Sequence, residues 1–218
     1  MFRAFLMACA IAFAIVPAVE ARSKKPKVTA HETGHFDYYV LSLSWSPAYC
    51  ATHPKDEDQC STQRYGFVLH GLWPQYDRGG FPETCSTEAT LDEEARSYAN
   101  SIFPSEKLVA HEWNKHGTCS GLDAMTYFTE SDRARNSISV PSRLEPGSRV
   151  LTATAQEITQ LIRDSNSGLT SSMLTVHCAG PQLSEVRVCL SKSLDPQECG
   201  NGMRSSCRPG KIQVRGVK

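Results

Sequence analysis

The sequence predicts an α+β fold reinforced by disulfide bonds, and two observations support this prediction. Segments with helical periodicity are interspersed with short apolar runs that do not alternate strictly, which indicates a mixture of helices and buried strands. Eight cysteines follow an N-terminal export signal, and an even number of cysteines in an exported chain indicates disulfide bonds.

Residues 1–21 are expected to form a signal peptide, and residues 22–218 a single mature domain. Arg3 supplies the positive start, and the apolar run that follows it is too short to span a bilayer. Small residues allow cleavage after Ala21, which also removes Cys9. We therefore expect a secreted or periplasmic protein with no membrane attachment after cleavage.

The first strands are expected at 37–45 and 67–70, with Gly71 and Pro74 ending the second. A disulfide-closed surface loop is expected from Cys50 to Cys60, and a second loop from 76 to 85. Later helices and strands follow from periodicity, from the capping-box pattern that begins at Thr90, and from the breaker Pro104 preceding a cap at Ser105. Helices are expected at about 90–100, 108–116, 123–135 and 152–164, and short strands at 173–176, 186–190 and 212–214.

The formal net charge is zero, from 23 basic and 23 acidic residues. This balance argues against a protein that binds nucleic acid through a broad positive field. It does not argue against an enzyme that holds only a few nucleotides.

The stretch from His111 to Cys119 concentrates chemically active side chains on one predicted helix, with Gly117 at the expected C-cap. Glu112 and His116 are four residues apart and share a face, which Lys115 adjoins. A base, an acid and a fixed positive charge therefore converge there.

A zinc site is one alternative for this helix, because His-Glu also opens the zinc metalloprotease motif. That motif requires histidines four residues apart, whereas His111 and His116 are five apart. Lys115 would also place a positive charge against the ion. We therefore expect no metal and no other cofactor.

His70 ends the apolar run of the second strand and is followed by Gly-Leu-Trp-Pro-Gln. A histidine at a strand end, opposite a helix carrying Glu, Lys and His, suggests acid–base chemistry with two histidines. A single histidine in this position would more often be a core residue with satisfied hydrogen bonds.

These two stretches resemble the active-site motifs of the ribonuclease T2 family of secreted endoribonucleases. The motifs read His-Gly-Leu-Trp-Pro and His-Glu-Trp-x-Lys-His-Gly-Thr-Cys, and both are complete here, with His70 and His111 41 positions apart. Residues 36–50 also resemble the family's first strand. The resemblance covers about residues 35–215 and implies an antiparallel sheet flanked by helices.

The resemblance implies a catalytic set consisting of His70, Glu112, Lys115 and His116. RNA carries its own nucleophile, the ribose 2′-hydroxyl, and two imidazoles near their ordinary pKa can carry both proton transfers. The family implies that His116 is the general base, His70 the general acid and Lys115 the group that stabilises the phosphorane. Glu112 is expected to orient Lys115 or bind the phosphate. The residues alone do not order the two histidines.

The substrate is expected to be single-stranded RNA, not DNA, bound by a monomer with little base specificity. His111 is expected to bind the phosphate, Trp73 and Tyr76 to stack on a base, and Gln75 to read a base edge. Leu108 and Val109 occupy places where many relatives have aromatic residues. The remaining histidines match neither motif and are expected to be surface or structural residues: His31, His35, His53 and His177.

Eight cysteines allow 105 pairings. The family resemblance, and not their spacing, implies the pairs Cys50–Cys60, Cys85–Cys119, Cys178–Cys207 and Cys189–Cys199. The second pair would tie the loop after the first motif to the end of the catalytic helix.

Two other classes of function remain open at this point. A non-catalytic relative would bind RNA or a protein without cleaving RNA. A metal-dependent hydrolase would use His111, Glu112 and His116, although the sequence has no carboxylate cluster suited to two metal ions.

Overall fold

The computed structural model describes Met1 and residues 32–61, 65–86, 88–145 and 150–216. The expected signal peptide, apart from Met1, lies outside the described residues, as does His31. None of the helices in the described ranges combines the length and the apolar character that a membrane crossing requires.

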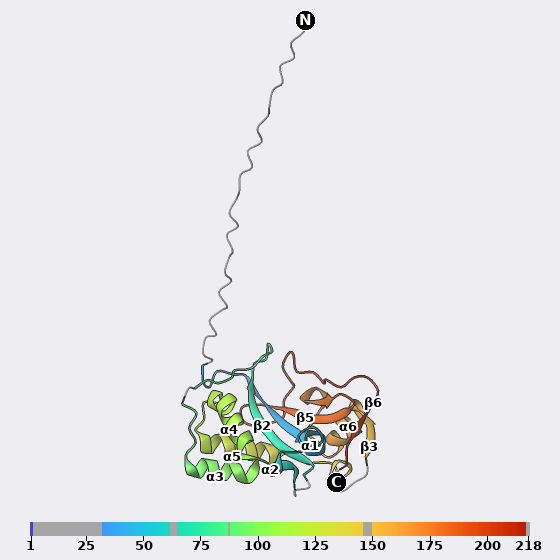
Figure 1. Cartoon of the computed structure of the whole chain (residues 1–218), viewed down its shortest axis with the longest axis horizontal. Helices are drawn as coiled ribbons and strands as arrows, with labels where there is room; N and C mark the ends of the chain where they lie inside the picture. The colour runs from blue at the N-terminus through green and yellow to red at the C-terminus, as the bar shows by residue number, and fades with distance from the viewer. Residues whose placement is uncertain (2–31, 62–64, 87, 146–149, 217–218) are drawn as a thin grey trace.

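A six-stranded sheet forms the centre of the fold (Figure 1). Its strand order is β2-β1-β5-β6-β3, and β4 pairs with β5. The pairings are antiparallel, as expected, apart from one parallel pairing of β5 with β6 at Gln182 and Gln213. The strands are β1 (Tyr38–Trp45), β2 (Phe67–Gln75), β3 (Leu151–Thr154), β4 (Leu174–Ala179), β5 (Gln182–Leu190) and β6 (Lys211–Val214).

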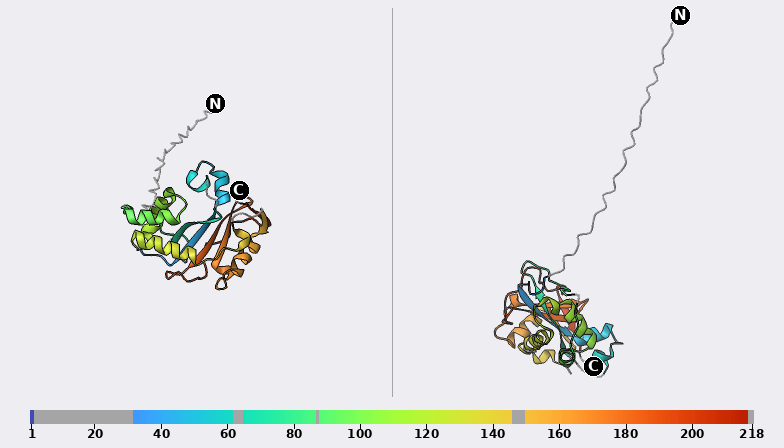
Figure 2. Two further views of the ribbon diagram at one scale, coloured as in Figure 1. Left: turned by 90° about the horizontal axis from the view of Figure 1, so that it is seen from below. Right: turned by 90° about the vertical axis from the view of Figure 1, so that its left-hand side faces the viewer.

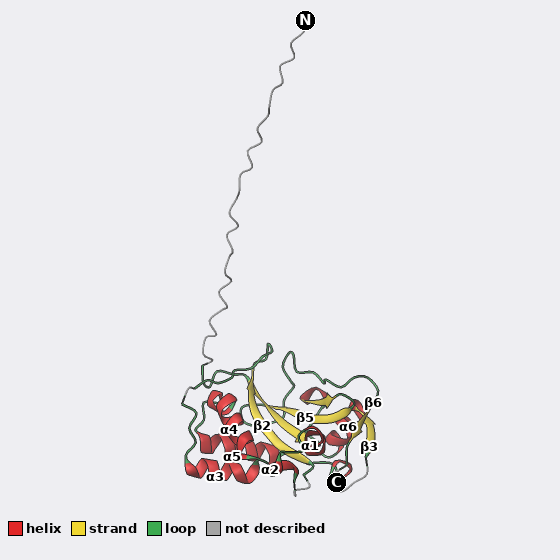
Figure 3. Cartoon of the chain, in the orientation of Figure 1, coloured by secondary structure: helices red, strands yellow, loops and turns green. Residues whose placement is uncertain are grey.

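Helices lie at both ends of the sheet (Figures 1 and 3). The α3, α4 and α5 helices gather beside β2, and α6 lies beside β3 and β4, so that the strands run between two helical groups (Figure 2, left). The helices are α1 (Ser46–Thr52), α2 (Glu57–Cys60), α3 (Glu93–Ile102), α4 (Glu106–Lys115), α5 (Ala124–Asn136) and α6 (Ala155–Asp164), with short 3-10 turns at Gly117–Cys119, Ser142–Leu144 and Ser171–Met173.

The two faces of β1 separate the main core from a smaller polar face. Tyr39, Leu41 and Leu43 belong to the large apolar core, which also contains Tyr127 and Phe128 of α5. The alternate residues of β1 point to the other face, as strand geometry requires. On that face Tyr38 and Val40 form a small cluster with Trp73 and Cys189, and Ser42 and Ser44 continue the row. This second face carries the site described below.

The second strand is longer than the sequence predicts. We expected it to end at Gly71 and Pro74, but β2 continues through both to Gln75. Because β2 lies at the edge of the sheet, the missing N–H of Pro74 is tolerated there.

Two helix starts also differ from the prediction. Asp92 caps α3 by accepting a hydrogen bond from the Ala95 amide, so the expected capping box at Thr90 is wrong. Residues 151–154 form strand β3, and the capping box of Thr154 and Glu157 begins α6. Ser105 caps α4 as expected, by accepting from the Leu108 amide.

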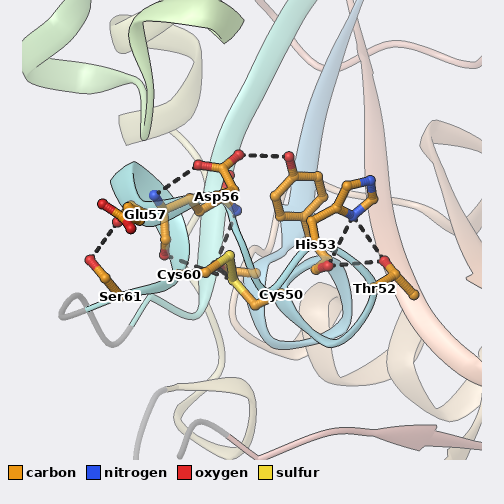
Figure 4. The surroundings of a disulfide bond; sticks show 10 residues. Cys50, Thr52, His53, Asp56, Glu57, Cys60 and Ser61 are labelled. Atoms are coloured by element: carbon orange, nitrogen blue, oxygen red, sulfur yellow. Dashed lines mark hydrogen bonds between the residues drawn. A yellow bond between two sulfur atoms is a disulfide. The ribbon is translucent and has the colours of Figure 1, made fainter.

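The segment from Cys50 to Cys60 is not a plain loop, because it contains the end of α1 and all of α2 (Figure 4). Asp56 caps α2 and also accepts a hydrogen bond from Tyr49 Oη at 2.8 Å. All four expected disulfides are present: Cys50–Cys60, Cys85–Cys119, Cys178–Cys207 and Cys189–Cys199.

Candidate active site

His70 occupies an irregular position in the sheet. Ser42 of β1 pairs with Gly71, and the next residue, Leu43, pairs with Leu69, so His70 is the extra residue of a β-bulge. Bulges redirect side chains and are frequent beside active sites. The bulge lets the core side of β2 stay in register while His70 faces the polar side of the sheet.

The second motif reaches the same place from α4, which lies beside the edge strand β2. Glu112 is completely buried, and its Oε2 accepts a hydrogen bond from Nε1 of Trp73 at 2.6 Å. Gly71 makes this approach possible, because a Cβ atom there would lie 2.0 Å from Oε2 of Glu112. The glycine of the first motif is therefore a steric requirement of the second.

Gly117 does not act as the expected left-handed C-cap. The α4 helix ends at Lys115 with His116 as its C-cap, and Gly117 begins a 3-10 turn. A Cβ atom at Gly117 would lie 2.3 Å from Cε3 of Trp113. Close packing against the indole, and not backbone conformation, explains the glycine. Trp113 itself is buried beside Tyr127, as expected for a packing residue.

The two motifs line a cavity of about 470 Å³. Seven of the eight predicted catalytic and substrate-binding residues line it; Tyr76 does not, and borders a separate hollow beside Phe36 and Lys192. The predicted residues in the cavity wall are His70, Trp73, Gln75, His111, Glu112, Lys115 and His116.

The sequence reasoning missed Glu185 and Arg187 of β5. Glu185 Oε1 lies 2.6 Å from Nδ1 of His70, and Arg187 lines the cavity. The strand was expected to begin at Val186, which left Glu185 outside it, and Arg187 was not selected although it lay within the expected strand. Glu185 and Arg187 are two residues apart in a mainly apolar run, and this spacing indicates that both side chains lie on the same face of a strand.

His177, which was expected to be a surface or structural residue, also lies in the cavity wall. Its Nε2 lies 2.9 Å from Oγ1 of Thr175. Burial, followed by the charge of Arg187, lowers the pKa of His177 to about 4. His177 is therefore neutral at neutral pH.

The two motif histidines have opposite pKa shifts. Burial lowers the pKa of His70, but the hydrogen bond that His70 donates to Glu185 and the charges of Glu112 and Glu185 outweigh it, so the net pKa lies above 6.5. Burial, then the positive charge of Lys115, lowers the pKa of His116 to about 3. At weakly acidic pH, His70 is thus protonated while His116 is neutral.

The surroundings of His116 are aromatic. Its ring stacks on Trp73 with centroids 5.1 Å apart, and Phe81 lies 5.8 Å away. Phe81 is 39% exposed, and Nζ of Lys115 lies 5.5 Å from its ring centre. Phe81 is thus an exposed aromatic side chain at the cavity that the sequence reasoning did not select.

The expected contact of Glu112 with Lys115 is replaced by other partners. Lys115 Nζ lies 3.7 Å from a carboxylate oxygen of Glu83. Glu112 instead binds Trp73, and its Oε1 lies 3.7 Å from Nε2 of His70. Burial raises the pKa of Glu112 to about 7, against the lowering effect of the His70 charge.

His111 lies in the same cavity wall, and burial together with the charge of Lys115 lowers its pKa. Gln75 lines the cavity but donates its amide N–H to the Pro74 carbonyl at 3.0 Å. Within the described ranges, no three His, Cys, Asp or Glu side chains are arranged so that they could hold a metal ion.

The Cys85–Cys119 disulfide joins the loop after β2 to the 3-10 turn that follows α4, as expected. Two hydrogen bonds reinforce the junction: Thr84 N donates to the Lys115 carbonyl, and Cys85 N donates to Oγ1 of Thr118. The end of α4 is therefore fixed by covalent and polar contacts.

Comparison with known proteins agrees with this geometry. The model of the ribonuclease T2 family matches residues 36–199. A ribonuclease of Aeromonas hydrophila is 40% identical over 204 residues, covering 86% of this chain and 89% of that protein. Ribonuclease DdI of Dictyostelium discoideum is 29% identical over 209 residues, covering 86% of this chain and 90% of that protein.

Solved structures show the same fold. An RNase-related protein from Calystegia sepium superposes with a TM-score of 0.65 at 25% identity, covering 83% of this chain and 96% of that one. RNase NT, solved in complex with 5′-AMP, gives a TM-score of 0.62 at 24% identity over 83% and 98% of the two chains. With both motifs converging on one cavity and the family model matching most of its length, the chain belongs to the ribonuclease T2 family and is a T2-type endoribonuclease.

Proposed function

We propose that this endoribonuclease cleaves single-stranded RNA by metal-independent transesterification, with His116 as general base and His70 as general acid. His116 takes the proton of the ribose 2′-hydroxyl, whose oxygen forms a new bond to phosphorus. The bond from phosphorus to the 5′-oxygen breaks, and His70 gives that oxygen its proton. The first product is a 2′,3′-cyclic phosphate, which water then opens to a 3′-phosphate.

The opposite pKa shifts of the two histidines carry this assignment. A general base must begin neutral and a general acid must begin protonated. The pKa of His116, lowered to about 3, and the raised pKa of His70 supply these states together over the weakly acidic range. Environments that separate the pKa values of two groups in one site support an acid–base pair.

The remaining polar groups fit the charge that develops on the phosphorane. Lys115 supplies a fixed positive charge in the cavity wall, which favours a negative transition state. Glu112, with its pKa raised to about 7, can donate a hydrogen bond to a phosphate oxygen while protonated. In the described part of the chain its Oε1 has no hydrogen-bond partner, which supports a contact with substrate. His111 is proposed to bind the phosphate.

We also propose low base specificity and export. The amide of Gln75 is engaged with its own backbone, so it is poorly placed to read a base edge. Trp73 is buried and hydrogen-bonded to Glu112. The exposed ring of Phe81 is therefore the better surface for a base to stack on. The four disulfides favour an oxidising compartment, in line with the expected signal peptide at 1–21.

The deciding experiment compares a short RNA with its 2′-deoxy counterpart in EDTA, with products identified by mass. Cleavage of RNA alone, to cyclic phosphate ends, is expected. Activity that is lost in EDTA and restored by zinc would overturn metal independence. Cleavage of the deoxy substrate would overturn the role of the 2′-hydroxyl.

His70→Ala and His116→Ala test the assigned residues in the same assay. Each is expected to abolish cleavage while circular dichroism and free-thiol measurements still report a folded, fully disulfide-bonded chain. Turnover close to wild type in either variant would refute the mechanism.

A further inference from the structure

We propose that Glu185 is a positioning residue for His70, holding its imidazole in one orientation and one tautomer through Nδ1. The inference rests on the proposed role of His70 as general acid. It adds a β5 carboxylate, itself held by Arg187, to the four catalytic residues of the two sequence motifs.

The hydrogen bonds at Nδ1 of His70 define the arrangement. Glu185 Oε1 lies 2.6 Å from Nδ1, and Ser44 Oγ lies 3.0 Å from it. Ser44 is the β1 partner of Glu185 in the sheet and donates to its Oε1 at 3.2 Å. With a carboxylate at Nδ1, that nitrogen carries hydrogen, and Nε2, on the side of Glu112, is the atom that exchanges its proton.

The other carboxylate oxygen of Glu185 is bound to Arg187. Its Oε2 accepts from Nε of Arg187 at 2.7 Å, and Nη2 lies 2.6 Å away. The Arg187 guanidinium also lies over the Trp73 ring, 4.8 Å from its centre. A carboxylate that is only 8% exposed requires such partners to stay charged, and here each oxygen has its own.

Glu185, with Oε1 on His70 and Oε2 on Arg187, acts on the His70 ring during the proton transfer. As the bond from phosphorus to the 5′-oxygen breaks, the electron pair passes to that oxygen, which takes the proton from Nε2 of His70. The Glu185 carboxylate stabilises the imidazolium before transfer and keeps the ring aimed. Charged and titratable groups face His70 from both neighbouring elements: Glu185 and Arg187 from β5, and His111, Glu112 and His116 from α4 and its end.

Glu185→Gln tests the inference with two substrates. One is a dinucleotide, whose alkoxide leaving group needs a proton. The other is a nucleoside 3′-aryl phosphate, whose nitrophenolate departs without one. For the dinucleotide, kcat/KM is expected to fall about tenfold at pH 8 and less than about threefold at pH 5. Without its negative partner His70 has a lower pKa, so a smaller fraction of it is protonated at pH 8, whereas at pH 5 it remains protonated. For the aryl ester, kcat/KM is expected to remain within about twofold of wild type at both pH values.

A double variant separates positioning from stability. Glu185→Gln with Arg187→Met removes the ion pair as a unit and leaves no unpartnered cation. It is expected to show the same leaving-group dependence as the single variant. Wild-type activity on the dinucleotide at pH 8 would overturn the inference, as would an equal loss on both substrates. The control is Glu130→Gln, which breaks the Glu130–Arg133 pair on α5 and should leave both substrates unaffected.

His70→Ala separates a failure of the proposed acid role of His70 from a failure of the positioning role of Glu185. If this variant loses activity equally on both substrates, the acid role of His70 fails and takes the Glu185 inference with it. If His70→Ala cleaves the aryl ester at a rate close to that of the wild type while Glu185→Gln does not, only the inference about Glu185 fails.

Discussion

Gly71 and Glu112 lie so close together that no side chain fits between them: a Cβ atom on Gly71 would lie 2.0 Å from Oε2 and 2.8 Å from Cδ of the glutamate. The same Cβ would lie 2.3 Å from Nε1 of Trp73, the donor to that carboxylate. The backbone of the edge strand is thus the surface on which the buried Glu112–Trp73 pair rests.

Gly71→Ala is therefore expected to displace both side chains and to impair catalysis more than stability. Overpacking should lower the free energy of unfolding by about 1–3 kcal/mol. A displacement of about 1 Å at the site should reduce kcat/KM by about 10²-fold. Gly168→Ala is the matched control, because its Cβ would have no neighbour within 4 Å, and it should retain full activity. Urea unfolding and initial rates check both values, and equal activities in the two variants would contradict this account.

Activity should follow a broad bell against pH. The acid limb reports His116, which is neutral above its pKa of about 3, so kcat/KM should rise as pH passes that value. The basic limb reports His70, whose raised pKa keeps it protonated past pH 6.5, so activity should fall only above that pH. Rates for a dinucleotide from pH 3 to 9, with circular dichroism to mark the folded range, test the profile. A rate still rising at pH 9 would refute it.

Trp73→Phe removes the indole N–H that binds Glu112 and should cost stability most where Glu112 is charged. The pKa of Glu112, already raised to about 7 by burial, should rise further, because the lost hydrogen bond favoured the ionised form. The expected loss is about 1–3 kcal/mol at pH 8 and less at pH 5.

Trp113→Phe is the comparison for that variant. Among the described residues Trp113 Nε1 has no hydrogen-bond partner, so only packing is lost. Its destabilisation should be the same at pH 8 and pH 5 in urea titrations. A pH-independent loss in Trp73→Phe would show that the hydrogen bond to Glu112 has no net effect.

Removing the Cys85–Cys119 disulfide with paired alanines should lower stability by about 2–5 kcal/mol. It should also lower kcat at temperatures where the chain remains folded, because the bond anchors the loop beside the end of α4. The Cys50–Cys60 pair closes a shorter loop, of 10 instead of 34 residues, and no residue of that loop lines the cavity. Its removal should therefore destabilise the chain less and leave kcat unchanged. Equal effects on kcat would refute this role for Cys85–Cys119.

The local pattern of the sequence predicted the elements well, but not their limits. Ser105 and Asp123 cap α4 and α5 through side chains that can be recognised in the sequence. Pro74 misled the prediction for β2, because the tolerance for proline depends on whether a strand lies at the edge of its sheet, which is a property of the whole topology. Thr154 begins α6 later than periodicity suggested, because residues 151–154 pair with β6 from the far end of the chain.

The sequence by itself identified the candidate catalytic residues His70, Glu112, Lys115 and His116, because they lie in two compact motifs that resemble those of the ribonuclease T2 family. Only the tertiary structure decided how these groups are paired and charged. Glu185 meets His70 across 115 positions of sequence, Trp73 meets Glu112 across 39, and Lys115 turns to Glu83. The physical reason is that protonation depends on burial and on neighbouring charges, and both are set by which strands and helices the fold brings together.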